Sequence, residues 1–472
     1  MFDLVVVGMG SGGLVAAEFA AGLGLRVAAV DRARIGGDCL WTGCVPSKAL
    51  LASAKVAHIM RTAHTVGITP VEPHIDLPTV WSRMRTVQAS IAATDDSPQR
   101  YRDLGVEVLR GVARLTGPNE VTVVREGDDD LVLSTRFVLL CTGSRPYLPP
   151  IDGLDPSTVL TSENLFTLAA PPRSVAIIGG GPMGVEMAQA LQRLGVVTTI
   201  FQRASTLLPR EEPALVEQLT ERLRAEGVQV HCTADVRSIE GTEGDGFVVH
   251  AVVGNDATTI RAQVGGVLVA AGRTPNAEHM GLEELGIELT DQGVRVDERG
   301  RTTVRSVYAA GDVAGRRLLT NSAGYEGVRA VRDMFFPGKG NLDAAVPACV
   351  FTDPELASVG LTADQAEEAF GTDTDVWRID LTHNDRARTD SHTDGAVMII
   401  TAKGRVVGAH VLAAAAGEMI HELSLAVQLR LRLDELAAAV HVYPTLSSSI
   451  GQIATESAFE KAHRLRWLMK RR

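Results

Sequence analysis

A glycine-rich turn occurs twice in this chain, each time after a short apolar run and before a stretch with helical periodicity. The glycines of the two turns are Gly8, Gly10, Gly13, Gly179, Gly181 and Gly184. Glycine keeps such a turn tight and lets the backbone approach a pyrophosphate, which binds the N–H groups at the start of the following helix. Two turns of this kind predict two dinucleotide-binding βαβ units in a chain of 472 residues.

The two units differ in the residue that closes their second strand. In the first unit, LRVAAVD ends at Asp31, whose carboxylate can accept hydrogen bonds from ribose hydroxyls. In the second unit, VVTTIFQR ends at Gln202 and Arg203, and an arginine can pair with a 2′-phosphate that an acid would repel. The second site is therefore predicted to prefer NADPH over NADH, the alternative being that Arg203 is simply exposed.

The second unit is expected to be inserted into the first domain. SVYAAGDVAG at 306–315 is a further strand, glycine and acid element, and its Asp312 can hold a ribityl hydroxyl. Two dinucleotide sites imply two cofactors, and a flavin is the usual partner of a nicotinamide that passes hydride. The expected cofactors are FAD and NADPH.

The segment GGDCLWTGCVPSK at 36–48 contains Cys39 and Cys44 with four residues between them. A helical pattern starts at Pro46, and proline is favoured at the first helical position, so Cys44 is expected at or just before a helix N-terminus. The helix dipole there lowers the pKa of a thiol and favours the thiolate. The spacing lets the two sulfurs meet as a redox pair, and the alternative is two unrelated buried cysteines.

These motifs together resemble the class I pyridine nucleotide–disulfide oxidoreductases, which include dihydrolipoamide dehydrogenase, glutathione reductase and mercuric reductase. The resemblance covers essentially the whole chain and also rests on CTGSRP at 141–146, GGGPMGVE at 179–186, AAGDV at 309–313 and VPACVFTDPELASVG at 346–360. It implies an α/β fold with two Rossmann-like domains and an α+β C-terminal domain that forms a homodimer. The implied domains are 1–150 and 273–345 for FAD, 151–272 for NAD(P) and 346–472 for dimerisation.

The resemblance also implies roles for single residues. Cys44 would be the thiolate beside the flavin, and Cys39 would be the interchange thiol that faces the substrate. Lys48 would lie near the flavin and pair with Glu186. The residues implied in cofactor binding are Gly8, Gly10, Ser11, Gly12, Gly13, Asp31, Gly37, Lys48, Gly111, Thr142, Gly143, Gly179, Gly181, Gly184, Arg203, Gly272, Gly311 and Asp312.

The chain departs from the family pattern in its C-terminal motif, HVYPTLSSS at 441–449. Tyr443 and Ser448 occupy the positions of the histidine and glutamate that serve dihydrolipoamide dehydrogenase and glutathione reductase as an acid-base dyad. His441 lies two residues before Tyr443, on the same side if the segment is extended, and is a candidate substitute, although a structural role is the favoured interpretation. Tyr443 has an unperturbed pKa of about 10, which is too high for an easy base, but it can donate a hydrogen bond or lie over a ligand.

Two more departures lie near the expected cofactors. Trp41 and Thr42 stand in the cysteine loop where the family often has Asn-Val, and the tryptophan can shield the disulfide or stack on a quinone. Pro182 stands where many relatives have an aromatic gate over the flavin. Both changes point to altered access for substrates.

The electron acceptor is therefore expected to be atypical: a soft metal ion such as Hg(II), or a disulfide. One alternative is an NAD(P)H:quinone reductase with direct transfer from the flavin, and another is a dihydrolipoamide dehydrogenase-like enzyme. A third is a non-catalytic redox-sensing subunit whose basic tail, KAHRLRWLMKRR at 461–472, docks a partner. The polar segment 378–395 can line an acceptor entrance, although a solvated loop and strand edge is the favoured interpretation.

Composition limits the partners. A formal net charge of −11 argues against a general nucleic-acid binder. No apolar run reaches the roughly 18 residues of a membrane span, and the sequence begins with a strand and a glycine turn rather than a secretory signal. A cytoplasmic protein is expected, and its five cysteines then do not indicate a structural disulfide framework.

Overall fold

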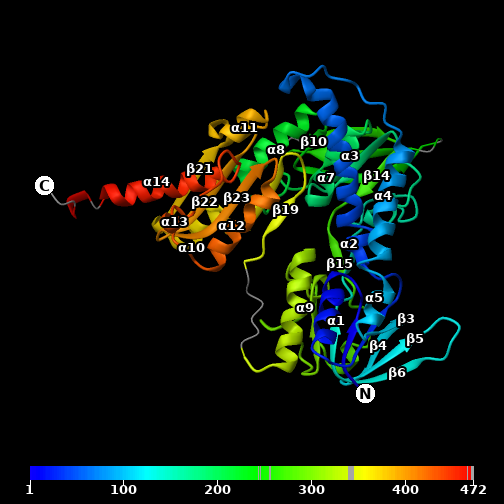
Figure 1. The fold of residues 1–472 in the computed structure, drawn as a ribbon. Helices are drawn as coiled ribbons and strands as arrows, with labels where there is room; N and C mark the ends of the chain where they lie inside the picture. The colour runs from blue at the N-terminus through cyan, green and yellow to red at the C-terminus, as the bar shows by residue number, and fades with distance from the viewer. Residues whose placement is uncertain (243, 245, 255–256, 339–344, 465, 469–472) are drawn as a thin grey trace.

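The computed structural model describes residues 1–242, 244, 246–254, 257–338, 345–464 and 466–468. In Figure 1 the N-terminal sheet lies at the bottom, an inserted region lies at the upper right, and a C-terminal sheet lies to the left. The last helix, α14 (Ser448–Arg464), extends away from the other elements toward the C-terminus. Five residues of the basic tail, 465 and 469–472, lie outside the described part of the chain.

A seven-stranded sheet carries the first glycine turn. Its order is β3-β2-β1-β6-β5-β4, with β18 paired to β6. Its strands are β1 (Phe2–Val7), β2 (Val27–Asp31), β3 (Glu107–Arg110), β4 (Val112–Gly117), β5 (Glu120–Val124), β6 (Leu131–Leu140) and β18 (Val307–Ala309). The pairs among β3, β2, β1, β6 and β18 are parallel. The apolar runs of β1, β2, β18 and the end of β6 are buried, as in the interior of a parallel sheet, whereas the edge strand β3 is not. Helices α1 (Ser11–Gly22) and α9 (Thr320–Phe335) lie side by side over this sheet (Figure 1).

A separate unit is inserted where two short strands leave and re-enter the first region. These strands, β7 (Ser144–Pro146) and β15 (Arg273–Pro275), pair in antiparallel orientation. Between them the chain forms a parallel sheet of order β10-β9-β8-β14 and an antiparallel sheet of order β11-β12-β13. The strands are β8 (Ser174–Ile178), β9 (Val197–Phe201), β10 (Gln229–His231), β11 (Ala234–Gly241), β12 (Phe247–Val253), β13 (Thr258–Val264) and β14 (Gly266–Val269), with helices α6 (Ser162–Leu165), α7 (Pro182–Arg193) and α8 (Pro213–Ala225).

The two glycine turns have nearly the same backbone geometry. Gly8 has a φ of +98°, and a Cβ added to it would lie 2.4 Å from the carbonyl oxygen of Cys141; Gly179 has a φ of +115°, and its Cβ would lie 2.3 Å from the oxygen of Ala270. The third glycine of each turn packs on the first. A Cβ on Gly13 would lie 1.9 Å from Gly8 O, and one on Gly184 would lie 2.0 Å from Gly179 O. Any side chain at the first or third glycine of either turn would collide with backbone atoms. Both units therefore need glycine at these positions.

Four helices connect β2 to β3 and cover the junction between the two regions. They are α2 (Gly37–Trp41), α3 (Cys44–Thr62), α4 (Leu77–Ala93) and α5 (Pro98–Asp103). Helix α3 packs against both α4 and α7, so it spans the boundary between the N-terminal sheet and the inserted unit. The buried cluster around Leu50, Trp81 and Val185 joins these helices in one apolar core.

The C-terminal region is an antiparallel sheet covered by helices. Its order is β19-β20-β23-β22-β21, and every neighbouring pair is antiparallel. The strands are β19 (Ala348–Val350), β20 (Glu355–Gly360), β21 (Thr374–Asp380), β22 (Ala396–Ala402) and β23 (Arg405–Ala413), with helices α10 (Ala363–Phe370), α11 (Asp385–Thr389), α12 (Ala416–Gln428), α13 (Leu433–Leu436) and α14. The predicted fold class, two Rossmann-like units plus an α+β C-terminal region, is confirmed. No helix in the described ranges is both long enough and apolar enough to cross a membrane.

Candidate redox active site

Cys39 and Cys44 lie on consecutive helices beside the first glycine turn. Cys39 is in α2, and Cys44 is the first residue of α3. Helix α3 therefore starts two residues before Pro46, where the sequence predicted the start. Helix α2 lies close to the first glycine turn, because a Cβ on Gly37 would be 2.6 Å from the Cα of Gly10. The dithiol is thus placed next to the loop expected to bind a pyrophosphate.

The two thiols interact directly, and the interaction makes them unequal. The hydrogen bond from Cys39 lowers the pKa of Cys44 to about 6, with further help from Thr320 and the positive charge of Lys48, and against the effect of burial. The same hydrogen bond, together with burial, raises the pKa of Cys39. The reduced pair is therefore a Cys44 thiolate that accepts a hydrogen bond from a Cys39 thiol at neutral pH.

Thr320 is a contact of the dithiol that the sequence did not reveal. It is the first residue of α9, and its Oγ1 lies 3.2 Å from the sulfur of Cys44. A thiolate has no proton, so toward the Cys44 thiolate the hydroxyl must be the donor. The two residues are 276 positions apart in the chain, and no local motif connects them.

Helix α2 is held by contacts at both of its ends. At the first end, Arg273 pairs with Asp38, and the Arg273 guanidinium also donates to the carbonyl oxygen of Ser144 at 2.9 Å. At the second end, the buried amide of Gln88 donates to Leu40 O and Trp41 O, each at 2.9 Å. These contacts fix the position of Cys39 between two other parts of the fold.

Trp41 is occupied by neighbours within its own loop. Its indole N–H donates to Ile35 O at 2.7 Å, and the guanidinium of Arg34 lies 4.0 Å from the centre of the ring. One face of the indole is therefore covered by a cation. This arrangement does not favour the expected stacking of an aromatic acceptor on that face.

Lys48 and Glu186 form an ion pair between α3 and α7. Lys48 Nζ lies 2.8 Å from Glu186 Oε2, and Glu186 is only 3% exposed. The other carboxylate oxygen of Glu186 accepts a hydrogen bond from the backbone N–H of Phe351 at 2.9 Å. The ring of Phe351 has the Lys48 ammonium 4.4 Å from its centre. The buried carboxylate is thus fully engaged, and a cation is held one helical turn from Cys44.

The residues around the first glycine turn fit a flavin dinucleotide. Gly10 is the N-cap of α1 and no side chain caps this helix, so the N–H groups of its first turn are open to an anion. Asp31 accepts backbone hydrogen bonds from Met9 at 2.7 Å and from Ala33 at 2.8 Å, which aligns the carboxylate beside the turn. Glycine at positions 10 and 37 lets the first glycine turn and the start of α2 approach each other closely.

The acid predicted to hold a ribityl hydroxyl, Asp312, belongs to a polar network. Ser144 Oγ donates to Asp312 Oδ2 at 2.5 Å, and Arg273 Nε lies 3.4 Å from the same oxygen. Burial raises the pKa of Asp312. The neighbouring Gly311 has its N–H bound by the buried Glu326 at 2.8 Å. Asp312 therefore has a fixed orientation next to the strand crossing of β7 and β15.

The remaining residues predicted to bind a cofactor lie after β6, after β3, at the start of α1 and before β15. Thr142 Oγ1 donates to Asn276 O at 2.6 Å, and Asn276 N donates to Gly143 O at 2.9 Å, so this loop is tied to the one after β15. Gly111, at the end of β3, has a φ of +158°, and its added Cβ would meet Val123 at 2.6 Å. Ser11 and Gly12 are in the first turn of α1, and Gly272 directly precedes β15.

The second glycine turn is open at its helix end and has a neutral side chain at the strand end. Gly181 is the N-cap of α7, and a Cβ on it would meet nothing within 4 Å. Gln202, not an acid, accepts a hydrogen bond from Gly180 N at 3.1 Å and donates to Thr206 O at 3.2 Å. Arg203 follows and is exposed. Pro182 is the first residue of α7 and presents no aromatic ring there.

The C-terminal motif separates His441 from Tyr443. Both oxygens of Glu422 lie 3.1 Å from His441 Nε2, and His441 Nδ1 lies 3.2 Å from Ala439 O, so this histidine is engaged by its own domain. Tyr443 is 72% exposed and donates to Asp385 Oδ2 at 2.7 Å. The segment is not a strand, and the two side chains have different partners, contrary to the expectation that they would share a direction.

The polar segment 378–395 includes the end of the edge strand β21 and the short helix α11. Several of its charges pair with one another at the surface, as in the Arg386–Asp390 ion pair. It also supplies Asp385, the partner of Tyr443. The segment therefore combines the favoured solvated interpretation with a direct contact to the C-terminal motif.

All five cysteines are free thiols. Burial raises the pKa of Cys141, Cys232 and Cys349, which favours their neutral forms. Among the described residues, no group of three or more His, Cys, Asp or Glu side chains forms a metal site. Low-pKa thiol chemistry is thus confined to Cys44.

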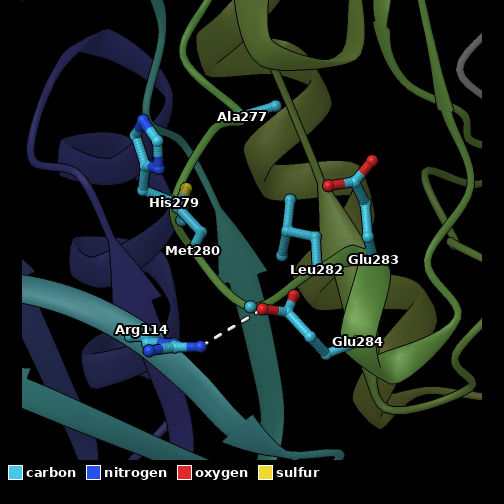
Figure 2. Close-up of a pocket in the computed structure, with 8 residues that line it drawn as sticks. Arg114, Ala277, His279, Met280, Leu282, Glu283 and Glu284 are labelled. Carbon is cyan, nitrogen blue, oxygen red and sulfur yellow. Dashed lines mark hydrogen bonds and ion pairs between the residues drawn. The ribbon is translucent and has the colours of Figure 1, made fainter.

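A hollow of about 220 Å³ lies away from the dithiol. Figure 2 shows it between β4 and the chain around η2 (Glu283–Leu285), with Arg114 reaching Glu284 across the opening. None of the predicted site residues is among those that line it. Its chemistry is that of surface ion pairs, and it does not contribute to the redox site.

Two family profiles match the chain. The profile described as "Pyridine nucleotide-disulphide oxidoreductase" matches residues 2–327, and that of its dimerisation domain matches residues 346–454. Among curated proteins, a dihydrolipoyl dehydrogenase of Bacillus subtilis (strain 168) is 34% identical over 464 residues, which is 97% of this chain and 95% of the relative. The leghemoglobin reductase of Glycine max is 32% identical over 472 residues, 98% of this chain and 88% of the relative.

Solved structures are similar to this chain over nearly its whole length. LpdA from Mycobacterium tuberculosis superposes with a TM-score of 0.88 at 29% identity, covering 97% of this chain and 99% of that one. The Cu(II) complex of the HOCl-induced flavoprotein disulfide reductase RclA from Escherichia coli has a TM-score of 0.84 at 27% identity, covering 96% and 99%. The similarity therefore extends over both dinucleotide-binding units and the C-terminal region.

Proposed function

Because the chain belongs to the class I pyridine nucleotide–disulfide oxidoreductases, a family of flavoprotein enzymes, we propose that it carries electrons from NADPH through FAD to a Cys39–Cys44 disulfide and on to an atypical acceptor. The observation that carries this proposal is the unequal dithiol. Cys44 has a pKa of about 6 at the start of α3, and Cys39 keeps its proton. A dithiol of this kind stores two electrons, one thiol serving for exchange with the acceptor and the other for transfer from the flavin.

The chain's own residues hold the dithiol and its surroundings in place. When bound, FAD would accept a hydride from the nicotinamide and transfer two electrons to a disulfide. Gly10, Ser11, Asp31 and Asp312 would hold this cofactor. The Lys48 ammonium, fixed by Glu186, supplies a positive charge near Cys44 and stabilises its thiolate. Thr320 donates a hydrogen bond to the same sulfur.

The proposal divides the chain into functional parts. Residues 1–150 and 273–345 would hold FAD, and 151–272 would hold the nicotinamide cofactor. Residues 346–472 would pair with a second copy, which the dimerisation-domain match and the exposure of Val440 (99%) and Tyr443 support. We also propose a cytoplasmic enzyme, since a reducing compartment supplies NADPH and keeps thiols free.

NADPH is the proposed electron donor. The support is Gln202 at the position where an acid would repel a 2′-phosphate, followed by the exposed Arg203. In the first unit the corresponding position is Asp31, whose carboxylate suits an unphosphorylated ribose. NADH is the expected weaker donor.

The proposed acceptor is a thiophilic metal ion, with a disulfide as the second class. The absence of a histidine at position 443 disfavours lipoamide and glutathione, whose thiols need a base. The solved Cu(II) complex of RclA supports a metal ion as the kind of ligand to test. One turnover would oxidise NADPH to NADP⁺ and H⁺ and reduce two Cu(II) to Cu(I), or one Hg(II) to Hg(0), with the electrons passing through the thiol pair.

The test is an anaerobic titration of the FAD-loaded protein with NADPH, followed in the visible spectrum. A long-wavelength charge-transfer band at the two-electron stage is expected, because the Cys44 thiolate would lie beside oxidised flavin. Cys44→Ser should remove the band, and Cys39→Ser should show it without any NADPH. A flavin that bleaches in the wild-type protein with no such band would contradict the dithiol route.

Acceptors are then compared in the same protein. Cu(II), Hg(II), oxidised lipoamide and a quinone are each supplied with NADPH, and Cys39→Ser is the matched variant. Reduction of metal ions or disulfides should be lost in this variant. Quinone turnover that survives the change, and exceeds every thiol-dependent activity in the wild type, would instead favour direct transfer from the flavin.

A further inference from the structure

The segment between β21 and β22 holds the C-terminal motif through a buried asparagine. Asn384 lies between η5 (Leu381–His383) and α11 and is 1% exposed. Its Oδ1 accepts a hydrogen bond from Ala387 N at 3.0 Å, which caps α11. Its amide nitrogen, which carries two N–H groups, lies 2.9–3.4 Å from four acceptor oxygens: Thr445 O, Leu446 O, Ser448 Oγ and Ser449 Oγ. The first turn of α11 is thereby locked against the turn that follows Tyr443.

Asp385, the next residue, extends this contact to the surface. Its Oδ2 accepts the hydroxyl proton of Tyr443 at 2.7 Å, and Arg388 Nη1 lies 3.6 Å from its Oδ1. The carboxylate favours the protonated phenol and raises the pKa of Tyr443. Tyr443 therefore remains a neutral phenol at physiological pH, with a defined direction for its proton.

We propose that Asp385 is a positioning residue for Tyr443 at the acceptor site, holding the hydroxyl proton so that the phenolic oxygen presents its lone pairs to the acceptor. This inference rests on the proposed function and on the arrangement that the family resemblance implies, in which the C-terminal motif of one subunit meets the thiols of the other. A phenol has one proton to donate and lone pairs to accept with. With its proton committed to Asp385, Tyr443 can ligate a cation or accept a hydrogen bond, but it does not donate one.

The arrangement points to a cationic acceptor. A phenolic oxygen whose proton is held by a carboxylate has lone pairs left to offer to a cation, which a thiolate of the partner subunit would ligate as well. It does not suit the role of a general acid, because the hydroxyl proton of Tyr443 is already donated to Asp385. His441 does not replace it, because both of its ring nitrogens are engaged by Glu422 and Ala439.

The experiment compares Asp385→Ala, Asp385→Asn, Tyr443→Phe and the Asp385→Ala/Tyr443→Phe double variant in the FAD-loaded full chain. Asp390→Ala is the matched control, because Asp390 is the carboxylate that directly follows the same short helix and pairs with Arg386 instead. Each protein is reduced with one equivalent of NADPH and then mixed rapidly with Cu(II). The rate of reoxidation by Cu(II) and the rate of reduction by NADPH are both recorded.

Loss of the oxygen in Tyr443→Phe should slow reoxidation by about 10-fold, and loss of its hydrogen-bond partner in Asp385→Ala by about 5-fold. Asp385→Asn keeps an acceptor oxygen and should recover to within about 2-fold of wild type. Because Asp385 acts through Tyr443, the double variant should match Tyr443→Phe alone. Reduction by NADPH should be unchanged in all of them, which a general loss of structure would not produce.

Three results would overturn the inference: wild-type reoxidation in Asp385→Ala, losses that multiply in the double variant, or an equal loss in Asp390→Ala. The proposed function and the role of Asp385 can each be contradicted separately. If the wild-type protein shows no charge-transfer band with NADPH, the proposed function fails and this inference falls with it. If the band forms and Asp385→Ala still reacts with Cu(II) like wild type, only the role of Asp385 is wrong.

Discussion

The two glycine turns of this chain share a backbone and differ in one side chain. Gly8 and Gly179 both have a positive φ, and both third glycines pack within about 2 Å of a carbonyl oxygen when a Cβ is added. At the end of the second strand, however, Asp31 accepts two backbone N–H groups, whereas Gln202 accepts one and donates one. The shared backbone fits the same pyrophosphate chemistry twice, and the differing side chain is where the choice of nucleotide can be made.

The two turns also differ in which residues of the redox centre lie next to them. The first turn lies against Gly37 and so adjoins the helix that carries Cys39. The second turn opens α7, whose first turns carry Glu186, the partner of Lys48. One unit therefore adjoins the thiols and the other supplies the carboxylate that fixes a cation beside them. Changes to the two turns should separate these contributions.

The largest effect is expected from a methyl group at the third glycine of either turn. Gly13→Ala and Gly184→Ala each place a Cβ about 2 Å from a backbone oxygen, which cannot be relieved by a side-chain rotation. Each should cost more than about 3 kcal/mol of unfolding free energy, the range of severe core changes. Gly13→Ala should also lose its FAD, measured as the flavin-to-protein absorbance ratio after purification.

The matched control is Gly181→Ala, whose Cβ meets nothing within 4 Å. This protein should unfold at the wild-type temperature and keep its FAD, but it should bind NADPH more weakly because the methyl group occupies the approach to the α7 N-terminus. If Gly184→Ala melts like wild type, the close packing of the second turn is wrong.

A smaller effect is expected from exchanging the side chains that distinguish the turns. Gln202→Glu places a negative charge where a 2′-phosphate would lie, so KM for NADPH should rise by about 10-fold or more while KM for NADH falls. Arg203→Ala should raise KM for NADPH without helping NADH. Steady-state kinetics with both nucleotides measure this, and Arg210→Ala serves as a control for loss of a nearby surface charge. An unchanged NADPH to NADH ratio in Gln202→Glu would contradict the proposed preference.

The fold was predictable from the sequence because its signals are local. A strand, a glycine turn and a helix stand within thirty or so residues of one another, and Pro46 correctly indicated a helix near Cys44. The contacts that build the site, in contrast, join residues that are far apart in the sequence. Thr320, Gln88 and Asp385 reach their partners from 276, 47 and 58 positions away, through side chains that form no motif. The suggestion that His441 shares the direction of Tyr443 assumed an extended segment, whereas the segment is a loop held by Asn384, and the role of His441 stays a prediction.

The smallest predicted effect concerns the pKa of Cys44 and the hydrogen bond that Thr320 donates to its thiolate. The pKa of Cys44 is lowered to about 6, so the thiolate exists above that pH and is lost as the pH falls through it. The charge-transfer band of the reduced enzyme should therefore titrate away with a midpoint near pH 6. Thr320→Val removes one hydrogen bond to the charged sulfur and should move this midpoint upward by about one unit, since such a bond contributes about 1.5 kcal/mol. Thr320→Ser keeps the hydroxyl and should retain the wild-type midpoint, and a valine variant that also retained it would leave Cys39 and Lys48 as the groups that set the pKa of Cys44.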